Sequence, residues 1–94
     1  MDTFEQLNSI FCKVFDDNDI KITKETTSND IDGWDSLSHV NLVVSIEKGF
    51  GVRFKNAEIL RWKNVGQMFE TIEEKLAEKN NPSQLYGDNS FLIN

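Results

Sequence analysis

The feature that most limits the possible fold is the spacing of the apolar residues, which recur every three or four positions in three separate segments. This spacing is typical of an α-helix that buries one face. The first segment begins at Phe4 and ends near Phe15, the second covers residues 37–50, and the third follows Asn64. Because 94 residues leave room for only one small domain, the helices must share a single core.

Side chains that can cap helices stand at the start of each segment. Such residues accept hydrogen bonds from backbone N–H groups that have no partner within the helix. A further capping residue predicts a short helix over residues 57–61, so we expect an all-α bundle of three long helices and one short one. The expected capping residues are Thr3 with Gln6, Asp35, Asn56, and Asn64 with Gln67.

Two stretches lack helical periodicity. Residues 16–35 form a long loop between the first two helices, although Ile20-Lys21-Ile22 has the composition of a short strand. After Leu76 the chain becomes polar and contains its only proline, Pro82. We therefore expect one domain over residues 1–79, followed by a polar C-terminal tail over residues 80–94.

The charge balance restricts the possible partners. The chain has 16 acidic and 10 basic residues, a net charge of −6, so it should repel nucleic acid and anionic lipid and favour basic proteins. No apolar run approaches the roughly 20 residues that span a bilayer, and the first residues lack the features of a signal peptide. The lone Cys12 excludes an intrachain disulfide and offers no metal-site spacing. These features predict a cytoplasmic protein.

The second predicted helix carries more apolar surface than one buried face needs. Its apolar residues spread over roughly 220° of the helical wheel, about twice the width of an ordinary buried stripe. We expect one side to pack in the core and the other to contact a partner, unless the whole helix is buried. The residues of this arc are Leu37, Val40, Leu42, Val43, Val44, Ile46 and Phe50.

Ser36 lies at the first position of this helix, directly after Asp35. A phosphate attached to its hydroxyl would lie at the positive end of the helix dipole, near backbone N–H groups that favour an anion. The simpler interpretation is that Ser36 is one more small polar residue at a helix start. Taken alone, the tripeptide Asp-Ser-Leu does not decide between the two.

The wider context resembles the acyl carrier protein family over about residues 3–78. The specific part is Gly33-Trp34-Asp35-Ser36-Leu37, continued by Ser45-Ile46-Glu47-Lys48-Gly49-Phe50-Gly51-Val52. The resemblance implies that a phosphopantetheinyl transferase attaches 4'-phosphopantetheine from coenzyme A to Ser36. The arm would then carry acyl or aminoacyl thioesters, and the chain itself would not be an enzyme.

The resemblance also implies roles for neighbouring residues and partners. Asp35 and Leu37 would flank the arm, and Asp35, Leu37, Val40 and Glu47 would contact partner enzymes. Those partners would be the transferase, a ligase or transferase that loads the acyl or aminoacyl group, and condensing or other acyl-transfer enzymes. The carrier is expected to act as a monomer, without nucleic acid or membrane.

The second helix departs from the pattern of fatty-acid carriers, which tend to be acidic there. Ser38, Asn41 and Lys48 leave Asp35 and Glu47 as the only acids between residues 35 and 50. Together with Trp34 and His39, this departure resembles carriers of specialised pathways more than those of housekeeping fatty-acid synthesis. Packing of the Trp34 indole over the loop is expected ahead of a contact with the arm or a partner.

Three other functions can be compared with the same residues. A Ser36–His39 nucleophile and base pair has no Gly-x-Ser-x-Gly elbow to support it. A calcium loop starting at Ser28 lacks the acidic first ligand, and His39 stands where a bidentate Glu is required. A small helical interaction domain without a prosthetic group remains the alternative, because it shares the apolar second helix and differs only in whether Ser36 is modified.

Overall fold

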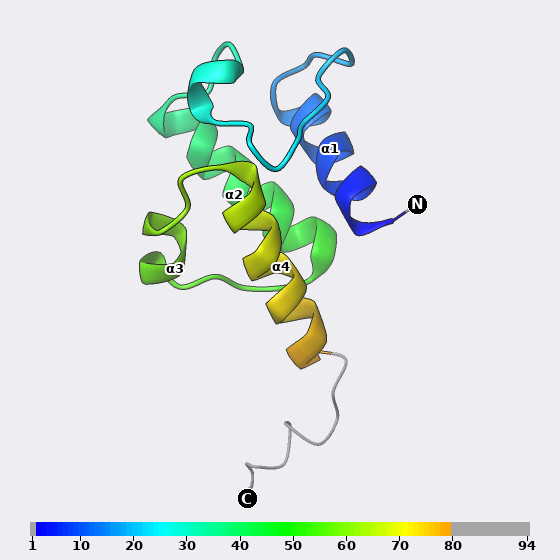
Figure 1. Ribbon diagram of the computed structural model, residues 1–94, viewed down its shortest axis with the longest axis vertical. Coiled ribbons are helices and arrows are strands. Elements are labelled where there is room, and N and C mark those ends of the chain that lie inside the picture. Colours follow the sequence, from blue (N-terminus) through cyan, green and yellow to red (C-terminus); the bar gives the residue numbers. More distant parts are fainter. Residues whose placement is uncertain (1, 80–94) are drawn as a thin grey trace, which may run out of the picture.

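The computed structural model describes residues 2–79, which form an all-helical bundle (Figure 1). The three long helices and one short helix expected from the sequence are all present, and the described residues contain no strand, so Ile20-Lys21-Ile22 is not one. The predicted tail over residues 80–94 lies outside the described residues. The helices are α1 (Thr3–Val14), α2 (Ser36–Phe50), α3 (Asn56–Leu60) and α4 (Val65–Lys79), and a 3₁₀ turn, η1 (Ser28–Asp30), lies in the first loop.

Helix α1 is capped one residue earlier than predicted. The Asp2 carboxylate accepts a hydrogen bond from the Glu5 N–H at 2.8 Å, and the Glu5 carboxylate accepts one from the Asp2 N–H at 3.2 Å. The expected Thr3–Gln6 box is therefore wrong. The Asp2–Glu5 pair has the same spacing, and carboxylates are better acceptors at the positive end of a helix. Gln6 instead donates to the Gly49 carbonyl of α2 at 3.0 Å.

The long first loop is held in place by a side chain of α1. Asn8 accepts a hydrogen bond from the Ile22 N–H at 2.7 Å and donates one to the Ile20 carbonyl at 3.0 Å. Ile22 is buried in the core, and Ile20 packs against it from a half-buried position. The side chain of Asn8 thus provides the partners that a neighbouring strand would supply.

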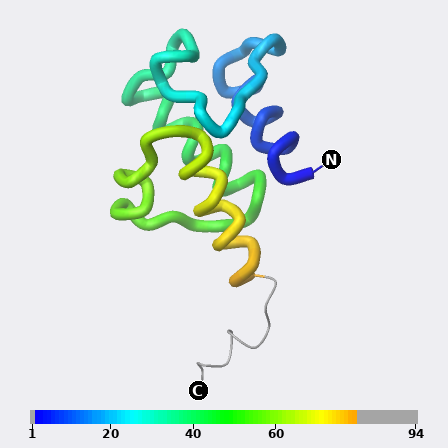
Figure 2. The backbone as a smooth tube through the Cα atoms, viewed as in Figure 1, coloured from blue at the N-terminus to red at the C-terminus, as the bar shows by residue number. Residues whose placement is uncertain are grey.

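The same loop also caps α4. The Val65 N–H donates to the Thr26 carbonyl and the Gly66 N–H to the Lys24 carbonyl, both at 2.8 Å. A Cβ at residue 66 would lie 2.9 Å from the Lys24 oxygen, so glycine permits this close approach. Figure 2 shows the result: the first loop passes along the bundle and meets the start of α4.

The predicted cap of α4 is confirmed in part, and the predicted start of α3 is wrong by one residue. Asn64 accepts a hydrogen bond from the Gln67 N–H at 2.9 Å as expected, although the Gln67 side chain accepts from the Lys63 N–H and not from that of Asn64. Helix α3 begins at Asn56 and not after it. The Glu58 carboxylate accepts from the Lys55 N–H at 2.8 Å, which moves the start of the helix back by one residue.

The core contains side chains from α1, α2 and α4 and from the loops between them. Helix α2 buries one side and exposes the other, as its wide apolar arc predicted. On the exposed side, Leu37, Val40 and Val44 retain 76%, 58% and 41% of their accessible surface. The core residues are Leu7, Phe11, Ile22, Leu42, Ile46, Phe50, Val52, Val65, Met68, Phe69 and Ile72.

Candidate functional site

The start of α2 is built by a reciprocal pair of hydrogen bonds between Asp35 and Ser38. The Asp35 carboxylate accepts from the Ser38 N–H at 2.9 Å, and the Ser38 hydroxyl accepts from the Asp35 N–H at 2.8 Å. The Ser38 hydroxyl also donates to the Gly33 carbonyl at 2.7 Å. The hydrogen bond from the Ser38 backbone is the main reason that the pKa of Asp35 lies below its usual range. Asp35 is therefore the cap that the sequence predicted.

Ser36 lies between Asp35 and Ser38 in the sequence, but its side chain forms no hydrogen bond with either residue. It is exposed at the first position of α2, and within residues 2–79 no hydrogen bond engages its hydroxyl. The two serines at this helix start thus differ sharply, because Ser38 is committed to the cap and Ser36 is available for reaction. An anion attached to Ser36 would lie at the positive end of the α2 dipole.

Trp34 and His39 form one unit beside Ser36. The Trp34 indole N–H donates to Nδ1 of His39 at 3.0 Å, and the two rings stack with an interplanar angle of 17°. The indole also packs edge-on against Phe11, with ring centroids 5.3 Å apart. The hydrogen bond requires a lone pair on Nδ1, so neutral His39 carries its proton on Nε2. Partial burial lowers the pKa of His39.

An open cavity of about 460 Å³ lies next to Ser36. Its walls come from the first loop, the start of α2, the α3–α4 connection and Met68 of α4. The lining is mixed, with aromatic rings, hydroxyls, an amide, one carboxylate and one ammonium group. A flexible chain attached to Ser36 fits such a site, because apolar and hydrogen-bonding parts of the chain both find partners. The remaining lining residues are Thr27, Ser28, Trp34, Asp35, His39, Trp62, Lys63 and Asn64.

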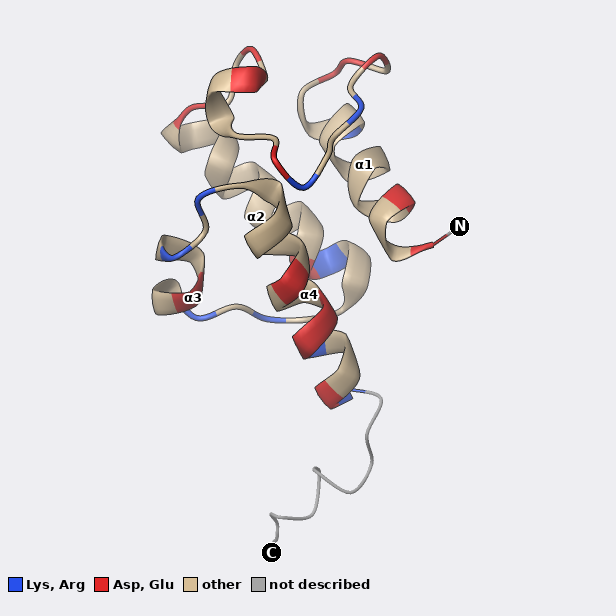
Figure 3. Ribbon diagram, in the orientation of Figure 1, with Lys and Arg blue, Asp and Glu red and all other residues tan. Residues whose placement is uncertain are grey.

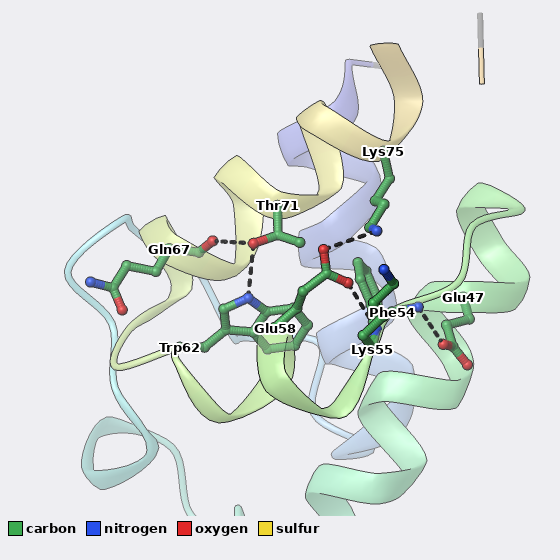
Figure 4. Close-up of polar contacts among 8 residues, drawn as sticks. All are labelled: Glu47, Phe54, Lys55, Glu58, Trp62, Gln67, Thr71 and Lys75. Atoms are coloured by element: carbon green, nitrogen blue, oxygen red, sulfur yellow. Dashed lines mark hydrogen bonds and ion pairs between the residues drawn. The ribbon is translucent and has the colours of Figure 1, made fainter. Parts of the chain in front are cut away.

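Trp62, which lines the cavity, is held in place by contacts with α4 and with Phe54 (Figure 4). Its indole N–H donates to the Thr71 hydroxyl at 2.9 Å, and its ring packs edge-on against Phe54 with centroids 5.0 Å apart. Thr71 in turn donates to the Gln67 carbonyl at 3.2 Å. The α3–α4 connection is therefore anchored to the body of α4.

The residues expected to contact partners lie in two environments. Leu37 and Val40 are exposed on α2, next to Ser36 along the helix. Glu47 is half-buried, and its carboxylate accepts a hydrogen bond from the Phe54 N–H at 2.9 Å (Figure 4). Its visible role is to hold the connection between α2 and α3.

The sequence pattern did not indicate the cavity. Thr27 and Ser28 face Trp62 and Lys63 only because the first loop caps α4, a contact between distant segments. Adjacent to this site or elsewhere in residues 2–79, no group of three His, Cys, Asp or Glu side chains is arranged to hold a metal ion. None of the helices in these residues is long and apolar enough to cross a membrane.

Comparisons with known proteins match this geometry. The model of the family described as "Phosphopantetheine attachment site" matches residues 5–72. An acyl carrier protein from Thermotoga maritima is 33% identical over 73 residues, which cover 78% of this chain and 90% of the relative. A holo acyl carrier protein from Geobacter metallireducens, solved by NMR, is 44% identical with a TM-score of 0.80. That alignment covers 92% of this chain and 97% of the solved one.

Proposed function

Because the chain belongs to the acyl carrier protein family, whose members carry a covalently attached phosphopantetheine, we propose that Ser36 is the attachment site of the arm. The observation that carries this proposal is the free, exposed hydroxyl of Ser36 at the start of α2, beside a cavity of about 460 Å³. The chain itself is a carrier and not a catalyst, as is general in the family.

The local geometry supports modification at this serine. Ser36 Oγ gives up its proton and bonds to the pantetheine-side phosphorus of coenzyme A. The bond from that phosphorus to the bridging oxygen of the diphosphate breaks, and adenosine 3',5'-bisphosphate leaves. The positive end of the α2 dipole favours the resulting anion. Once attached, the group supplies a terminal thiol that holds cargo as a thioester. Asp35 keeps the helix start, and hence the Ser36 backbone, in one conformation.

The walls of the cavity can also shelter the attached chain. Trp34 and Trp62 present aromatic surface from two different segments, and Lys63 and Asn64 add hydrogen-bond donors. Each indole is already held by a hydrogen bond, to His39 and Thr71 respectively, so little conformational entropy is lost when a chain packs against it.

We further propose that the carrier serves a specialised pathway and carries acyl or aminoacyl groups, in contrast to housekeeping fatty-acid synthesis. Support comes from α2, whose exposed side has Asn41 and Lys48 where fatty-acid carriers tend to be acidic. Its one acid beyond the cap, Glu47, has its carboxylate bonded to the Phe54 N–H. The Trp34–His39 pair beside Ser36 adds a second departure from the fatty-acid pattern.

Acyl carrier proteins partner with phosphopantetheinyl transferases and with enzymes that handle acyl groups. For this chain we propose docking at the start and outer side of α2, around Asp35, Leu37 and Val40, with Glu47 shaping the far end. A loading ligase or transferase, and then a condensing or other acyl-transfer enzyme, would bind there in turn. Exposed apolar side chains on a helix are suited to such brief contacts.

Intact-mass measurement tests the attachment. The purified chain is incubated with coenzyme A and a broad-specificity phosphopantetheinyl transferase, beside the variants Ser36→Ala and Ser45→Ala. The wild type and Ser45→Ala should gain the mass of one phosphopantetheine, and Ser36→Ala should gain nothing. A folded wild type that gains no mass with several such transferases would favour an interaction domain without a prosthetic group.

A further inference from the structure

The charge of this chain is distributed very unevenly along its helices (Figure 3). Residues 2–35 carry nine acidic and three basic residues, and residues 64–79 carry four and two. The intervening segment, residues 36–63, reverses the balance with five basic and two acidic residues. This segment contains Ser36, all of α2 and α3. The net charge of −6 therefore does not describe α2, α3 and the connections that follow them.

The two acids of this segment are already engaged. The Glu47 carboxylate accepts a hydrogen bond from the Phe54 N–H at 2.9 Å. Glu58 accepts one from the Lys55 N–H and forms an ion pair with Lys75 of α4, with the charged atoms 2.9 Å apart (Figure 4). Glu58 is thus paired with a lysine of α4, whereas Glu47 keeps its negative charge.

The five basic side chains, in contrast, are all exposed. None of them forms an ion pair within residues 2–79. The ion pair in this part of the chain joins Lys75 and Glu58. They are Lys48, Arg53, Lys55, Arg61 and Lys63.

These cations share shallow hollows with the exposed apolar side chains. Val44 lines one hollow together with Lys48, Arg53 and the single acid Glu47. Leu60, which is 83% exposed, lines another together with Arg61 and Lys63, and Glu70 and Glu74 of α4 line this hollow as well. Lys63 also lines the cavity beside Ser36. Exposed apolar side chains and basic side chains thus occur together both beside α2 and beside α3.

We propose that this α2–α3 surface docks a partner enzyme whose own docking patch is apolar and rimmed by Asp and Glu side chains. The proposal rests on the carrier function proposed above. Leu37, Val40, Val44 and Leu60 supply the apolar contact, and the basic rim steers an acidic partner into place. The first loop, which carries seven acids and two lysines over residues 15–35, repels the same partner and so favours one orientation of binding.

A titration with two designed peptides tests this choice of partner. Both peptides are amphipathic helices with the same apolar face, one with Glu and the other with Lys at every flanking position. Each is titrated into the ¹⁵N-labelled full chain at two salt concentrations. The Glu peptide should bind at least about tenfold more tightly at low salt, lose affinity as salt rises, and shift the amide signals of α2 and α3.

Two charge-matched variants make the test specific to the surface. Lys48→Glu/Arg53→Glu/Arg61→Glu should lose most of the affinity for the Glu peptide. Lys13→Glu/Lys21→Glu/Lys24→Glu changes the net charge equally and should keep it, because those exposed lysines lie on α1 and the first loop. A lower affinity for the Glu peptide than for the Lys peptide, equal affinities, no binding of the Glu peptide, or equal losses in both variants would overturn the proposal.

The titration needs no arm on Ser36. The mass measurement therefore tests whether Ser36 is modified. The titration tests separately whether the surface prefers an acidic partner. Repeating the titration with the modified chain then measures whether the Glu peptide still binds after the arm is attached.

Discussion

Two serines two positions apart divide the tasks at the start of α2. Ser38 gives its hydroxyl to the cap, where it contacts the Asp35 N–H and the Gly33 carbonyl. Ser36 gives its hydroxyl to nothing within residues 2–79. Removing the Ser36 hydroxyl should therefore leave the fold intact. Replacing Asp35 or Ser38 should destabilise the start of α2, because each supplies a capping hydrogen bond.

Replacing Asp35 by Ala should lower the midpoint of urea unfolding, because the Ser38 N–H at the start of α2 would lose its acceptor. Asp35→Asn is the matched control and should retain most of the stability, since an amide oxygen can still cap the helix. Ser36→Ala should unfold at the same urea concentration as the wild type. Equal midpoints for Asp35→Ala and the wild type would show that this cap does not hold the helix.

His39 should make stability depend on pH. Burial lowers its pKa in the folded chain, so the unfolded chain binds the proton first as pH falls. The free energy of unfolding should therefore decrease from about pH 6.5 down to the lowered pKa, and level off below it. Asp35 and Lys63 are the other charged groups that line the same cavity.

Urea unfolding at several pH values, with His39→Gln as the control, measures this effect. The variant should lose the part of the pH dependence that lies just below pH 6.5. In the wild type, the Trp34 indole N–H signal should move over the lowered pKa range, because protonated Nδ1 can no longer accept its hydrogen bond. Identical pH profiles for the two chains would contradict this role of His39.

At the level of helices, α2 has two faces with different tasks. Leu42 is fully buried in the core, and Leu37 on the same helix is 76% exposed. This difference allows two identical substitutions to be compared. Leu42→Ala should lower the free energy of unfolding by about 2–5 kcal/mol, through lost burial and the cavity left behind. Leu37→Ala should change it by about 0.5 kcal/mol or less.

The same pair of variants separates folding from docking. Leu37→Ala should weaken binding of the Glu peptide while the urea unfolding curve stays in place. Similar losses of stability for both leucines would mean that α2 buries its whole apolar arc, which would remove the proposed docking surface.

Local signals predicted the helices well, and contacts between distant residues account for what they missed. Asp35 at the start of α2 and Gly51 at its end are strong local signals, and Gly51 does adopt the left-handed conformation that ends the helix. The width of the apolar arc likewise predicted two faces. Asp2 displaced the expected Thr3 cap because two residues offered the same spacing, and carboxylates compete better there.

The site as a whole was only partly predictable. Ser36 and Asp35 stand in one continuous motif, so the sequence alone indicated them. The cavity depends on the Thr26–Val65 hydrogen bond, which joins the first loop to α4 across the chain. The sequence predicted Glu47 to be an exposed acid that contacts partners. In the structure it is half-buried and accepts a hydrogen bond from the Phe54 N–H, because the α2–α3 connection turns back beside it.

The whole molecule combines an acidic body with one basic and apolar side next to a free serine. In this arrangement, function depends first on which hydroxyl receives the arm. Several serines lie on α2 or line the cavity, namely Ser28, Ser36, Ser38 and Ser45. Ser36 combines exposure and a hydroxyl without a hydrogen bond with the first position of a 15-residue α-helix, whereas Ser28 begins only a three-residue 3₁₀ turn.

Fragmentation mass spectrometry of the modified, full-length chain locates the arm directly. The mass of one phosphopantetheine should appear on fragments that contain Ser36 and be absent from fragments that contain only Ser28, Ser38 or Ser45. An arm found on any of these other serines, in a chain that remains folded, would contradict the assignment of Ser36 as the carrier site.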